Sequence, residues 1–271
     1  MNQPITATYG HGTENDFVIF FDPDDSLEIS PLIVAALCNR TSGIGADGVI
    51  RIVPQDKRWF MDYRNADGSI AEMCGNGIRV MARYLVERGH QPEGIFAIDT
   101  RDGLKHLRVP LVDDISVNMG KIYDENEEVT ATVNGATYSG FNINVGNPHA
   151  VVFTEDLSTL GSLESAPTVA PADSYPDGVN VEFVQILPGH EAKMRVHERG
   201  SGETRSCGTG TCAVALAATM QSRESLPARW VIYPPGGRLV VDIDPHSNAT
   251  LTGPSLLIKD LDVTSYFVSE K

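Results

Sequence analysis

Two stretches of the sequence share one pattern, a cysteine followed by Gly-x-Gly and then by small or apolar residues. They read Cys74-Gly75-Asn76-Gly77-Ile78-Arg79-Val80-Met81-Ala82 and Cys207-Gly208-Thr209-Gly210-Thr211-Cys212-Ala213-Val214-Ala215. The cysteines are 207 − 74 = 133 residues apart, close to half of the 271-residue chain. Helical spacing of apolar residues predicts helices over 75–87 and 208–221, each beginning just after its cysteine. One such turn means little, but two copies half a chain apart indicate an internal repeat.

Short runs rich in β-branched and aromatic residues, separated by Gly, Pro, Asn and Asp, fill the rest of both halves. They predict strands over 17–21, 48–53, 59–63, 96–99, 107–112, 115–119, 129–133, 150–153, 179–186, 192–198, 229–232, 239–243 and 256–259. A third helix is predicted over 30–38, introduced by Ser-Pro. The pattern indicates an α/β fold of the α+β type, with two pseudo-symmetric lobes that are each a mainly antiparallel sheet or barrel around one central helix.

The repeat also suggests where the lobes divide. We expect an N-terminal lobe over residues 1–118 that carries Cys74, and a C-terminal lobe over 119–260 that carries Cys207. Residues 261–271 are candidates for a return to the first lobe. The active site is then expected in the cleft between the lobes.

The composition argues against several classes of partner. The chain has 21 basic and 36 acidic residues, a formal charge of 21 − 36 = −15, which opposes binding to nucleic acid or anionic lipid. The first 30 residues lack the basic start and apolar core of a signal peptide, and no stretch approaches the roughly 20 apolar residues that span a bilayer. We expect a soluble, cytoplasmic protein with a small-molecule substrate.

A cysteine at the start of a helix is suited to acid and base chemistry. Unpaired backbone N–H groups and the helix dipole stabilise a thiolate there, so the thiol pKa is expected below about 8.5. The glycines leave room for a substrate carboxylate against the same N–H groups. Two thiols on opposite sides of one α-carbon are what stereoinversion requires, and the two helix starts look electrostatically alike.

Simpler interpretations of the cysteines remain open. A cysteine in a glycine-rich turn is often a small buried residue, and Cys38 and Cys212 are best interpreted in this way. A disulfide between Cys74 and Cys207 is disfavoured in a reducing compartment. A metal site is not expected, because no Cys-x-x-Cys or His-x-x-x-His spacing is present.

The chain resembles the diaminopimelate epimerase family over nearly its whole length. The resemblance rests on seven motifs in order: Asn15-Asp16-Phe17, Gly43-Ile44-Gly45-Ala46-Asp47-Gly48, Tyr63-Arg64-Asn65-Ala66-Asp67-Gly68-Ser69, Met73-Cys74-Gly75-Asn76-Gly77-Ile78-Arg79, Gly146-Asn147-Pro148-His149, Gly178-Val179-Asn180-Val181 and Glu198-Arg199-Gly200-Ser201-Gly202-Glu203-Thr204-Arg205-Ser206-Cys207-Gly208-Thr209-Gly210. The resemblance implies a racemase-type fold and a pyridoxal-independent enzyme, with no cofactor, that converts LL-2,6-diaminopimelate to the meso isomer for lysine and cell-wall synthesis. It also implies a homodimer.

Site residues follow from the resemblance position by position. Cys74 and Cys207 correspond to the acid/base pair, and His149 and Glu198 to residues that orient or tune the reacting centre. The substrate's charged groups would be bound by the side chains of Asn15, Asn65, Asn147, Asn180, Glu198 and Arg199 and by the backbone of Gly75, Asn76, Gly208 and Thr209. From the residues alone, each asparagine is more often a turn residue, and Asn65 in Asn-Ala-Asp-Gly is the most ambiguous.

One departure and several alternatives remain. Many family members carry Gln where this chain has Gly48, so one polar substrate contact is missing unless water or a neighbouring side chain replaces it. Proline racemases and hydroxyproline epimerases also use paired cysteines, and phenazine-type isomerases share the fold without them. A thiol redox sensor and a non-catalytic binding module are the alternatives from other classes.

Overall fold

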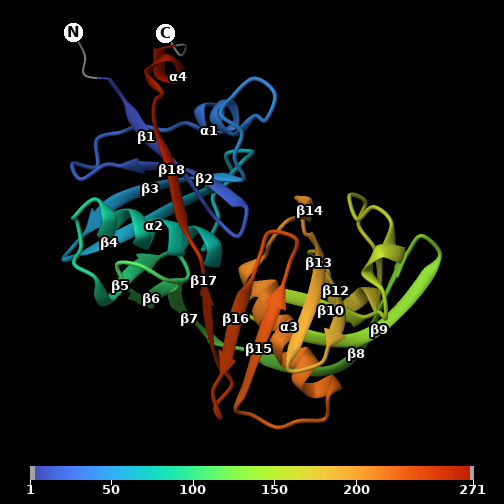
Figure 1. Cartoon of the computed structure of the whole chain (residues 1–271). Coiled ribbons are helices and arrows are strands. Elements are labelled where there is room, and N and C mark those ends of the chain that lie inside the picture. The colour runs from blue at the N-terminus through green and yellow to red at the C-terminus, as the bar shows by residue number, and fades with distance from the viewer. Residues whose placement is uncertain (1–3, 269–271) are drawn as a thin grey trace. The chain divides into compact units, whose positions relative to one another are not determined.

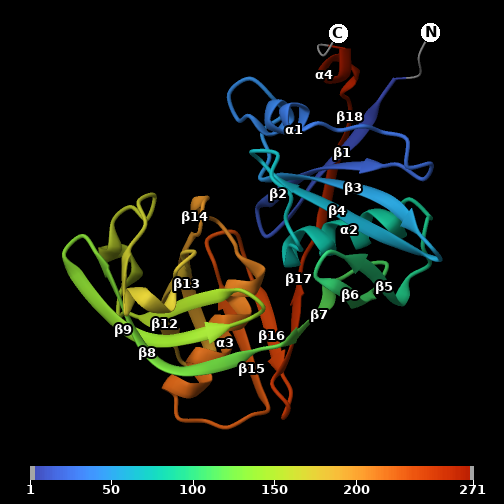
Figure 2. The ribbon, with the colours of Figure 1, turned by 180° about the vertical axis from the view of Figure 1, so that it is seen from behind.

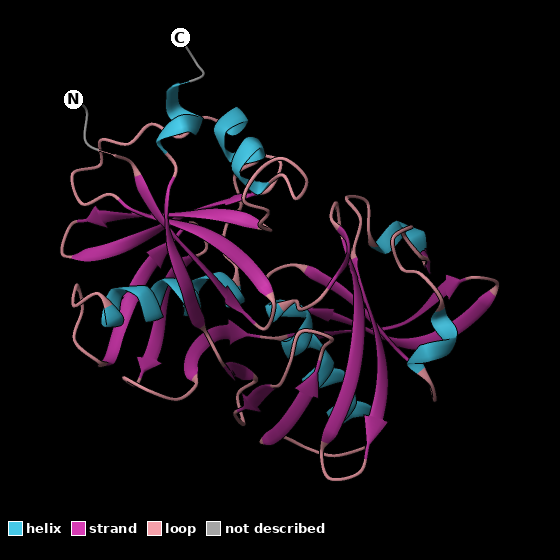
Figure 3. Cartoon of the chain, turned by 45° about the horizontal axis from the view of Figure 1, so that its top comes forward, coloured by secondary structure: helices cyan, strands magenta, loops and turns pink. Residues whose placement is uncertain are grey.

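The chain folds into two compact units, each built mostly of strands. The computed structural model describes residues 4–268. One unit comprises the residues up to Val117 together with those from Pro254 onward, and the other comprises Asn118–Gly253. Figure 3 shows that strands, in magenta, make up most of each unit. The expected two-lobed α+β fold is therefore confirmed.

The first unit holds the short helix α1, the longer helix α2 and most of the N-terminal strands (Figure 1). Its elements are β1 (Thr6–Gly12), β2 (Asn15–Phe21), α1 (Pro31–Cys38), β3 (Gly48–Gln55), β4 (Arg58–Asn65), α2 (Gly75–Glu87), β5 (Gly94–Thr100), β6 (Gly103–Val109), β18 (Leu256–Asp262) and α4 (Thr264–Val268). Strand β7 (Ile115–Lys121) starts in this unit and leads into the second. Residues 261–271 were candidates for a return to the first lobe, and strand β18 already pairs with β1 from Leu256 onward.

The second unit is wound around one buried helix (Figure 2). Its elements are β8 (Tyr123–Val133), β9 (Ala136–Asn144), β10 (Pro148–Phe153), the 3-10 turn η1 (Leu157–Leu160), β11 (Thr168–Ala170), the 3-10 turn η2 (Ala172–Ser174), β12 (Asn180–Leu187), β13 (Glu191–Glu198), β14 (Gly202–Thr204), α3 (Gly208–Gln221), β15 (Ala228–Tyr233), β16 (Leu239–Ile243) and β17 (Asn248–Gly253). Helix α3 packs against strands on several sides, including β9, β10, β12, β15 and β16.

Both units follow the same series of strand pairings. In the first, β1–β2 is antiparallel, β2–β3 parallel and β3–β4 antiparallel, and after α2 the pairs are β4–β5 parallel and β5–β6 and β6–β7 antiparallel. In the second, the same types recur as β9–β10, β10–β12 and β12–β13, and after α3 as β13–β15, β15–β16 and β16–β17. The predicted internal repeat thus extends to the topology, in which α2 and α3 are equivalent.

The three predicted helices are confirmed, and the differences lie in the shorter elements. The strand predicted over 107–112 ends at Val109, because Pro110 has no N–H to continue the ladder. Strands β9 and β17 were not predicted, because glycine, asparagine and threonine interrupt their apolar patterns. Helix α4 was not predicted either, because it is only five residues long.

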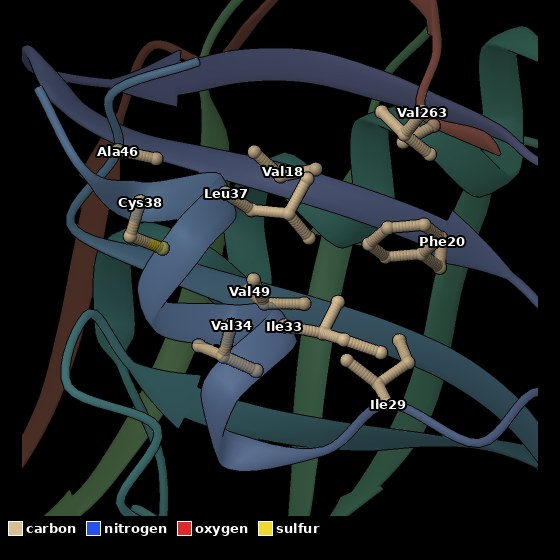
Figure 4. Close-up of a cluster of buried hydrophobic side chains, with 11 residues drawn as sticks. Val18, Phe20, Ile29, Ile33, Val34, Leu37, Cys38, Ala46, Val49 and Val263 are labelled. Atoms are coloured by element: carbon tan, nitrogen blue, oxygen red, sulfur yellow. The ribbon is translucent and has the colours of Figure 1, made fainter. Parts of the chain in front are cut away.

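The apolar interior explains two of the cysteines. Cys38 lies at the end of α1 in a cluster with Val18, Phe20, Leu37 and Val49 (Figure 4). Cys212 is fully buried in α3. Both are therefore core residues, as predicted. No helix in residues 4–268 is long and apolar enough to cross a membrane.

One hydrogen bond anchors the far end of α3. The indole Nε1–H of Trp230 on β15 donates to Thr219 Oγ1 over 2.9 Å, and both side chains are buried. Buried N–H groups that lose their only acceptor destabilise a protein, because they have also lost water. This bond therefore holds in place the helix that begins at Cys207.

We predict that Thr219→Val lowers the free energy of unfolding by about 1–3 kcal/mol, whereas Thr219→Ser, which keeps the hydroxyl, costs less. Urea unfolding followed by Trp230 fluorescence measures this, in a Trp59→Phe background that removes the only other tryptophan. Equal midpoints for the two variants would contradict the prediction.

Candidate functional site

Each cysteine caps the central helix of its unit. Cys74 is the N-cap of α2 and Cys207 the N-cap of α3, both with extended backbone. The sulfur of Cys74 accepts the N–H of Gly77 over 3.4 Å, and the sulfur of Cys207 accepts the N–H of Gly210 over the same distance. The sulfur thus takes the place that a serine or aspartate oxygen usually takes at an N-cap. The predicted position of both thiols at helix starts is confirmed.

In the first unit, asparagines surround Cys74. We call Cys74, Asn15, Asn76 and Asp47 the first half-site. The Cys74 thiol donates to Asn15 Oδ1 over 3.5 Å, and Asn76 Nδ2 donates to the same oxygen over 3.2 Å. Asn15 Nδ2 donates to Asp47 Oδ2 over 2.7 Å. The orientation of the Asn15 amide is thereby set, with its oxygen toward the cysteine.

A charged network holds Asp47 in turn. Arg40 donates to Asp16 Oδ1 over 2.9 Å and to Asp47 Oδ1 over 2.6 Å. Burial and the neighbouring Asp16 raise the pKa of Asp47. Burial also opposes ionisation of Asp16, but the hydrogen bonds from Arg40 and Tyr9 outweigh it and lower the pKa of Asp16. This network was not predicted, although Asp16 and Asp47 lie within two of the motifs shared with the family.

Asn65 and Gly48 have local roles in the structure. Asn65 ends β4, its Nδ2 donates to Ser69 Oγ over 3.0 Å, and its backbone closes the following turn. A Cβ atom at Gly48 would lie 2.5 Å from the Arg64 carbonyl oxygen and 2.6 Å from the Tyr63 ring. The Tyr63 ring therefore fills the space where a longer side chain at position 48 would start.

In the second unit, a connected group of polar residues lies beside Cys207. We call Cys207, Glu198, His149, Asn147 and Glu182 the second half-site. His149 is completely buried, its Nδ1 lies 2.7 Å from Glu182 Oε1, and its Nε2 lies 3.0 Å from Asn147 Oδ1. Glu198 accepts a hydrogen bond from the Thr204 hydroxyl and interacts with the Cys207 side chain. The predicted residues His149, Glu198 and Asn147 thus come together with Cys207.

The remaining predicted residues of the second unit adjoin the second half-site. Thr209 Oγ1 is 3.5 Å from the Cys207 sulfur, and Gly208 opens the helix. Asn180 Oδ1 accepts the backbone N–H of Arg199 over 2.9 Å, and the guanidinium of Arg199 donates to the Asp177 carbonyl over 3.1 Å. Asn180 is next to His149 in the parallel register of β10 and β12, so this pair adjoins the second half-site.

Burial changes the expected chemistry of Cys207. Desolvation, followed by the neighbouring Glu198 and Glu182, raises the pKa of the Cys207 thiol well above its usual value, although the Gly210 N–H acts in the opposite direction. Burial likewise raises the pKa of Glu198. The expectation of a lowered thiol pKa was therefore wrong for Cys207. The two carboxyl groups and the loss of water destabilise a thiolate there more than the helix start stabilises it.

The two helix starts also differ in what lies beneath them. A Cβ atom at Gly77 would meet the apolar ends of Met61, Ile50 and Phe17, whereas one at Gly210 would lie 2.5 Å from Glu182 Oε1. The expectation that the two starts are electrostatically alike was wrong. Glu182 was missed by the sequence analysis, and the available signal was a single charged residue inside the apolar strand 179–186.

Among residues 4–268, no three His, Cys, Asp and Glu side chains are grouped so that they could hold a metal ion. The four cysteines are not joined to one another.

We predict that Cys207 alkylates with a pH midpoint above the value of about 8.5 that is usual for a free cysteine. A raised pKa keeps the thiol protonated from neutral pH up to and beyond that value, so the reactive thiolate forms only at higher pH. Iodoacetamide labelling, quantified by mass spectrometry of the Cys207 peptide, measures the midpoint. The same peptide in urea is the control, and a native midpoint at or below the urea value would refute the prediction.

Comparisons with known proteins agree over nearly the whole chain. The family model described as "Diaminopimelate epimerase" matches residues 7–123 and 141–258. The diaminopimelate epimerase of Streptomyces coelicolor is 46% identical over 276 residues, with 96% of each chain covered. That of Thermobifida fusca is 42% identical, with 94% of this chain and 96% of the relative covered.

Solved structures show the same fold at low identity. A hydroxyproline epimerase from Agrobacterium vitis is 14% identical with a TM-score of 0.70, and covers 94% of this chain and 91% of its own. A phenazine biosynthesis protein of the PhzF family from Bacillus anthracis is 12% identical with a TM-score of 0.73, and covers 97% and 99%. These two similarities concern the fold alone. The family model and the close relatives together show that the chain belongs to the diaminopimelate epimerase family.

Proposed function

We propose that this chain interconverts LL- and meso-2,6-diaminopimelate by passing an α-proton between Cys74 and Cys207, without a cofactor. The observation that carries the proposal is the paired N-cap geometry, in which equivalent helices of the two units each present a sulfur beside a glycine-lined first turn. The product of this reaction feeds the synthesis of lysine and of the peptidoglycan cell wall.

The reaction needs one base and one acid on opposite faces of the α-carbon. One cysteine, as thiolate, takes the α-proton, and the opposite cysteine, as thiol, gives its proton to the other face. After one inversion the two sulfur atoms have exchanged protonation states. We assign the role of proton donor in the resting enzyme to Cys207, because its raised pKa keeps a proton on the thiol. The proposal requires the two half-sites to face one substrate from either side.

Backbone amides would stabilise the charge that develops during the reaction. When the α-proton leaves, negative charge spreads into the α-carboxylate, and helix N-termini bind such anions. We assign this role to the N–H donors of Gly75 and Asn76 in the first turn of α2 and of Gly208 and Thr209 in the first turn of α3.

The side chains near the cysteines suit a substrate that has two ammonium and two carboxylate groups. We assign Asn15, Asn65, Asn147, Asn180 and Arg199 to binding those groups, and Glu198 and His149 to orienting the reacting centre. Asn15 presents an amide oxygen, which suits an ammonium group. Asn65 is the weakest of these assignments, because its described hydrogen bonds stay within its own turn.

We further propose that the protein is a cytoplasmic homodimer that acts on this small molecule and binds no nucleic acid. The net charge of −15 supports the last point. Sedimentation of the purified protein tests the assembly, and a single species at the one-chain mass of 29.3 kDa would contradict the dimer.

The decisive experiment follows solvent deuterium into the α-carbon of LL-diaminopimelate under reducing conditions. We predict exchange and inversion by the wild type, and a loss of inversion of about 10²–10⁴-fold or more in Cys74→Ala and in Cys207→Ala, since each removes one of the two proton carriers. Cys38→Ala is the matched control, because Cys38 lies in the α1 core cluster and should leave the rate unchanged. No exchange by the reduced wild type, or exchange into proline instead, would overturn the substrate assignment.

A further inference from the structure

Three side chains form a hydrogen-bonded row in the second half-site. Glu182 Oε1 lies 2.7 Å from His149 Nδ1, and His149 Nε2 lies 3.0 Å from Asn147 Oδ1. Glu182 and His149 are both completely buried, whereas Asn147 is half-buried. Only the asparagine can therefore meet a ligand directly.

The contact between His149 and Asn147 places a proton on His149 Nε2. An amide oxygen has only lone pairs to offer, so a hydrogen bond to Asn147 Oδ1 requires an N–H at Nε2. The contact at Nδ1 then needs a second proton, carried either by the ring nitrogen or by the Glu182 carboxyl. In both cases the pair of Glu182 and His149 holds two protons and has no net charge.

The surroundings of Glu182 favour this neutral pair. Its Oε2 is buried and has no hydrogen-bond partner among residues 4–268. Glu198, Cys207 and Tyr175 are close enough to interact electrostatically with it, and none of them carries a positive charge. An uncompensated charge would be costly in this interior.

The fold leaves room for this carboxyl group in the second unit. Position 210 is a glycine, and a Cβ atom there would collide with Glu182 Oε1 at 2.5 Å. The matching glycine of the first unit, Gly77, faces the apolar side chains of Phe17 and Ile50 instead. The hydrogen-bonded row from Glu182 through His149 to Asn147 is therefore specific to the second half-site and is not part of the repeated scaffold.

We propose that Glu182 is a positioning residue that acts through His149 to fix the amide of Asn147. With Asn147 Oδ1 held by the His149 N–H, the Nδ2 group is turned the other way and presents two N–H donors. Such donors suit a carboxylate and not an ammonium group. Glu182 would thereby determine which charged group of the substrate the second half-site accepts, a conclusion that rests on the proposed function for the identity of the substrate.

The proton arrangement is measured first, without any variant. NMR spectra of protein with ¹⁵N-labelled histidine rings distinguish a protonated from a bare ring nitrogen, and the signals of His149 among the seven histidines are those lost in His149→Asn. We expect a proton on Nε2 in the folded protein. A bare Nε2 in the wild type would overturn the proposal.

The variant Glu182→Gln tests the positioning role. A glutamine amide keeps the shape, but it can either accept from an Nδ1–H through its oxygen or donate to a bare Nδ1 through its nitrogen. It therefore no longer selects one ring tautomer, and Asn147 can present either end to the substrate carboxylate. We expect the Nε2–H signal to weaken and KM for diaminopimelate to rise about twofold or more, because only part of the protein then holds Asn147 in the binding orientation, with a smaller change in kcat. An unchanged KM together with an unchanged Nε2 signal would overturn the proposal.

An exposed pair on the same unit provides the matched control. His190 Nε2 lies 2.9 Å from Glu224 Oε2, and both side chains are about half exposed. Glu224→Gln makes the same chemical change and should leave both KM and the His149 signals as in the wild type. Far-UV circular dichroism and the urea midpoint of Trp230 fluorescence verify that Glu182→Gln is folded.

The two proposals fail in different ways. If the wild type does not turn over diaminopimelate but His149 bears the Nε2 proton and its Nε2–H signal weakens in Glu182→Gln, the positioning role stands and the proposed substrate fails. If turnover is as expected but the ring signals and KM do not respond to Glu182→Gln, the positioning role fails and the proposed function stands.

Discussion

The structure depends on one unusual helix cap, a cysteine sulfur that accepts the N–H of the third helical residue. This contact occurs in both units at 3.4 Å, to Gly77 and to Gly210. A sulfur is a weaker acceptor than the oxygen of a serine or aspartate, so the cap contributes less to helix stability. It instead places a reactive atom among backbone N–H groups that a carboxylate can use. The buried helices, the glycines and the surrounding sheets keep that atom in place.

The repeated scaffold has diverged beneath the two caps. Apolar side chains, including Phe17 and Ile50, pack under Gly77, whereas Glu182 lies under Gly210. Together with Glu198 it disfavours a thiolate at Cys207. Two units of one topology therefore present thiols in different electrostatic surroundings. A reaction in which one sulfur is base while the other is acid benefits from such a difference, because it decides where the proton resides between turnovers.

Neighbouring side chains also fix the orientation of two asparagine amides. Asp47 holds the nitrogen of Asn15, so that its oxygen faces the cysteine of the first half-site. His149 contacts the oxygen of Asn147, which leaves the nitrogen for a ligand. Free asparagine can rotate to offer either end at little cost. Here Asp47 and His149 each hold one end of an amide and remove that freedom. Each half-site is therefore preorganised for one kind of charged group.

The sequence by itself determined the repeat, the three main helices and the positions of Cys74 and Cys207, because helical spacing, N-terminal glycines and ordered motifs are local signals. It also identified Asn147, His149 and Glu198, but only as members of a motif pattern. The tertiary structure decided the pKa of Cys207, the turn role of Asn65 and the part played by Glu182. These depend on desolvation and on contacts between strands distant in sequence, which no local pattern encodes. Glu182 and His149 are 33 residues apart and meet only because β10 and β12 pair in parallel.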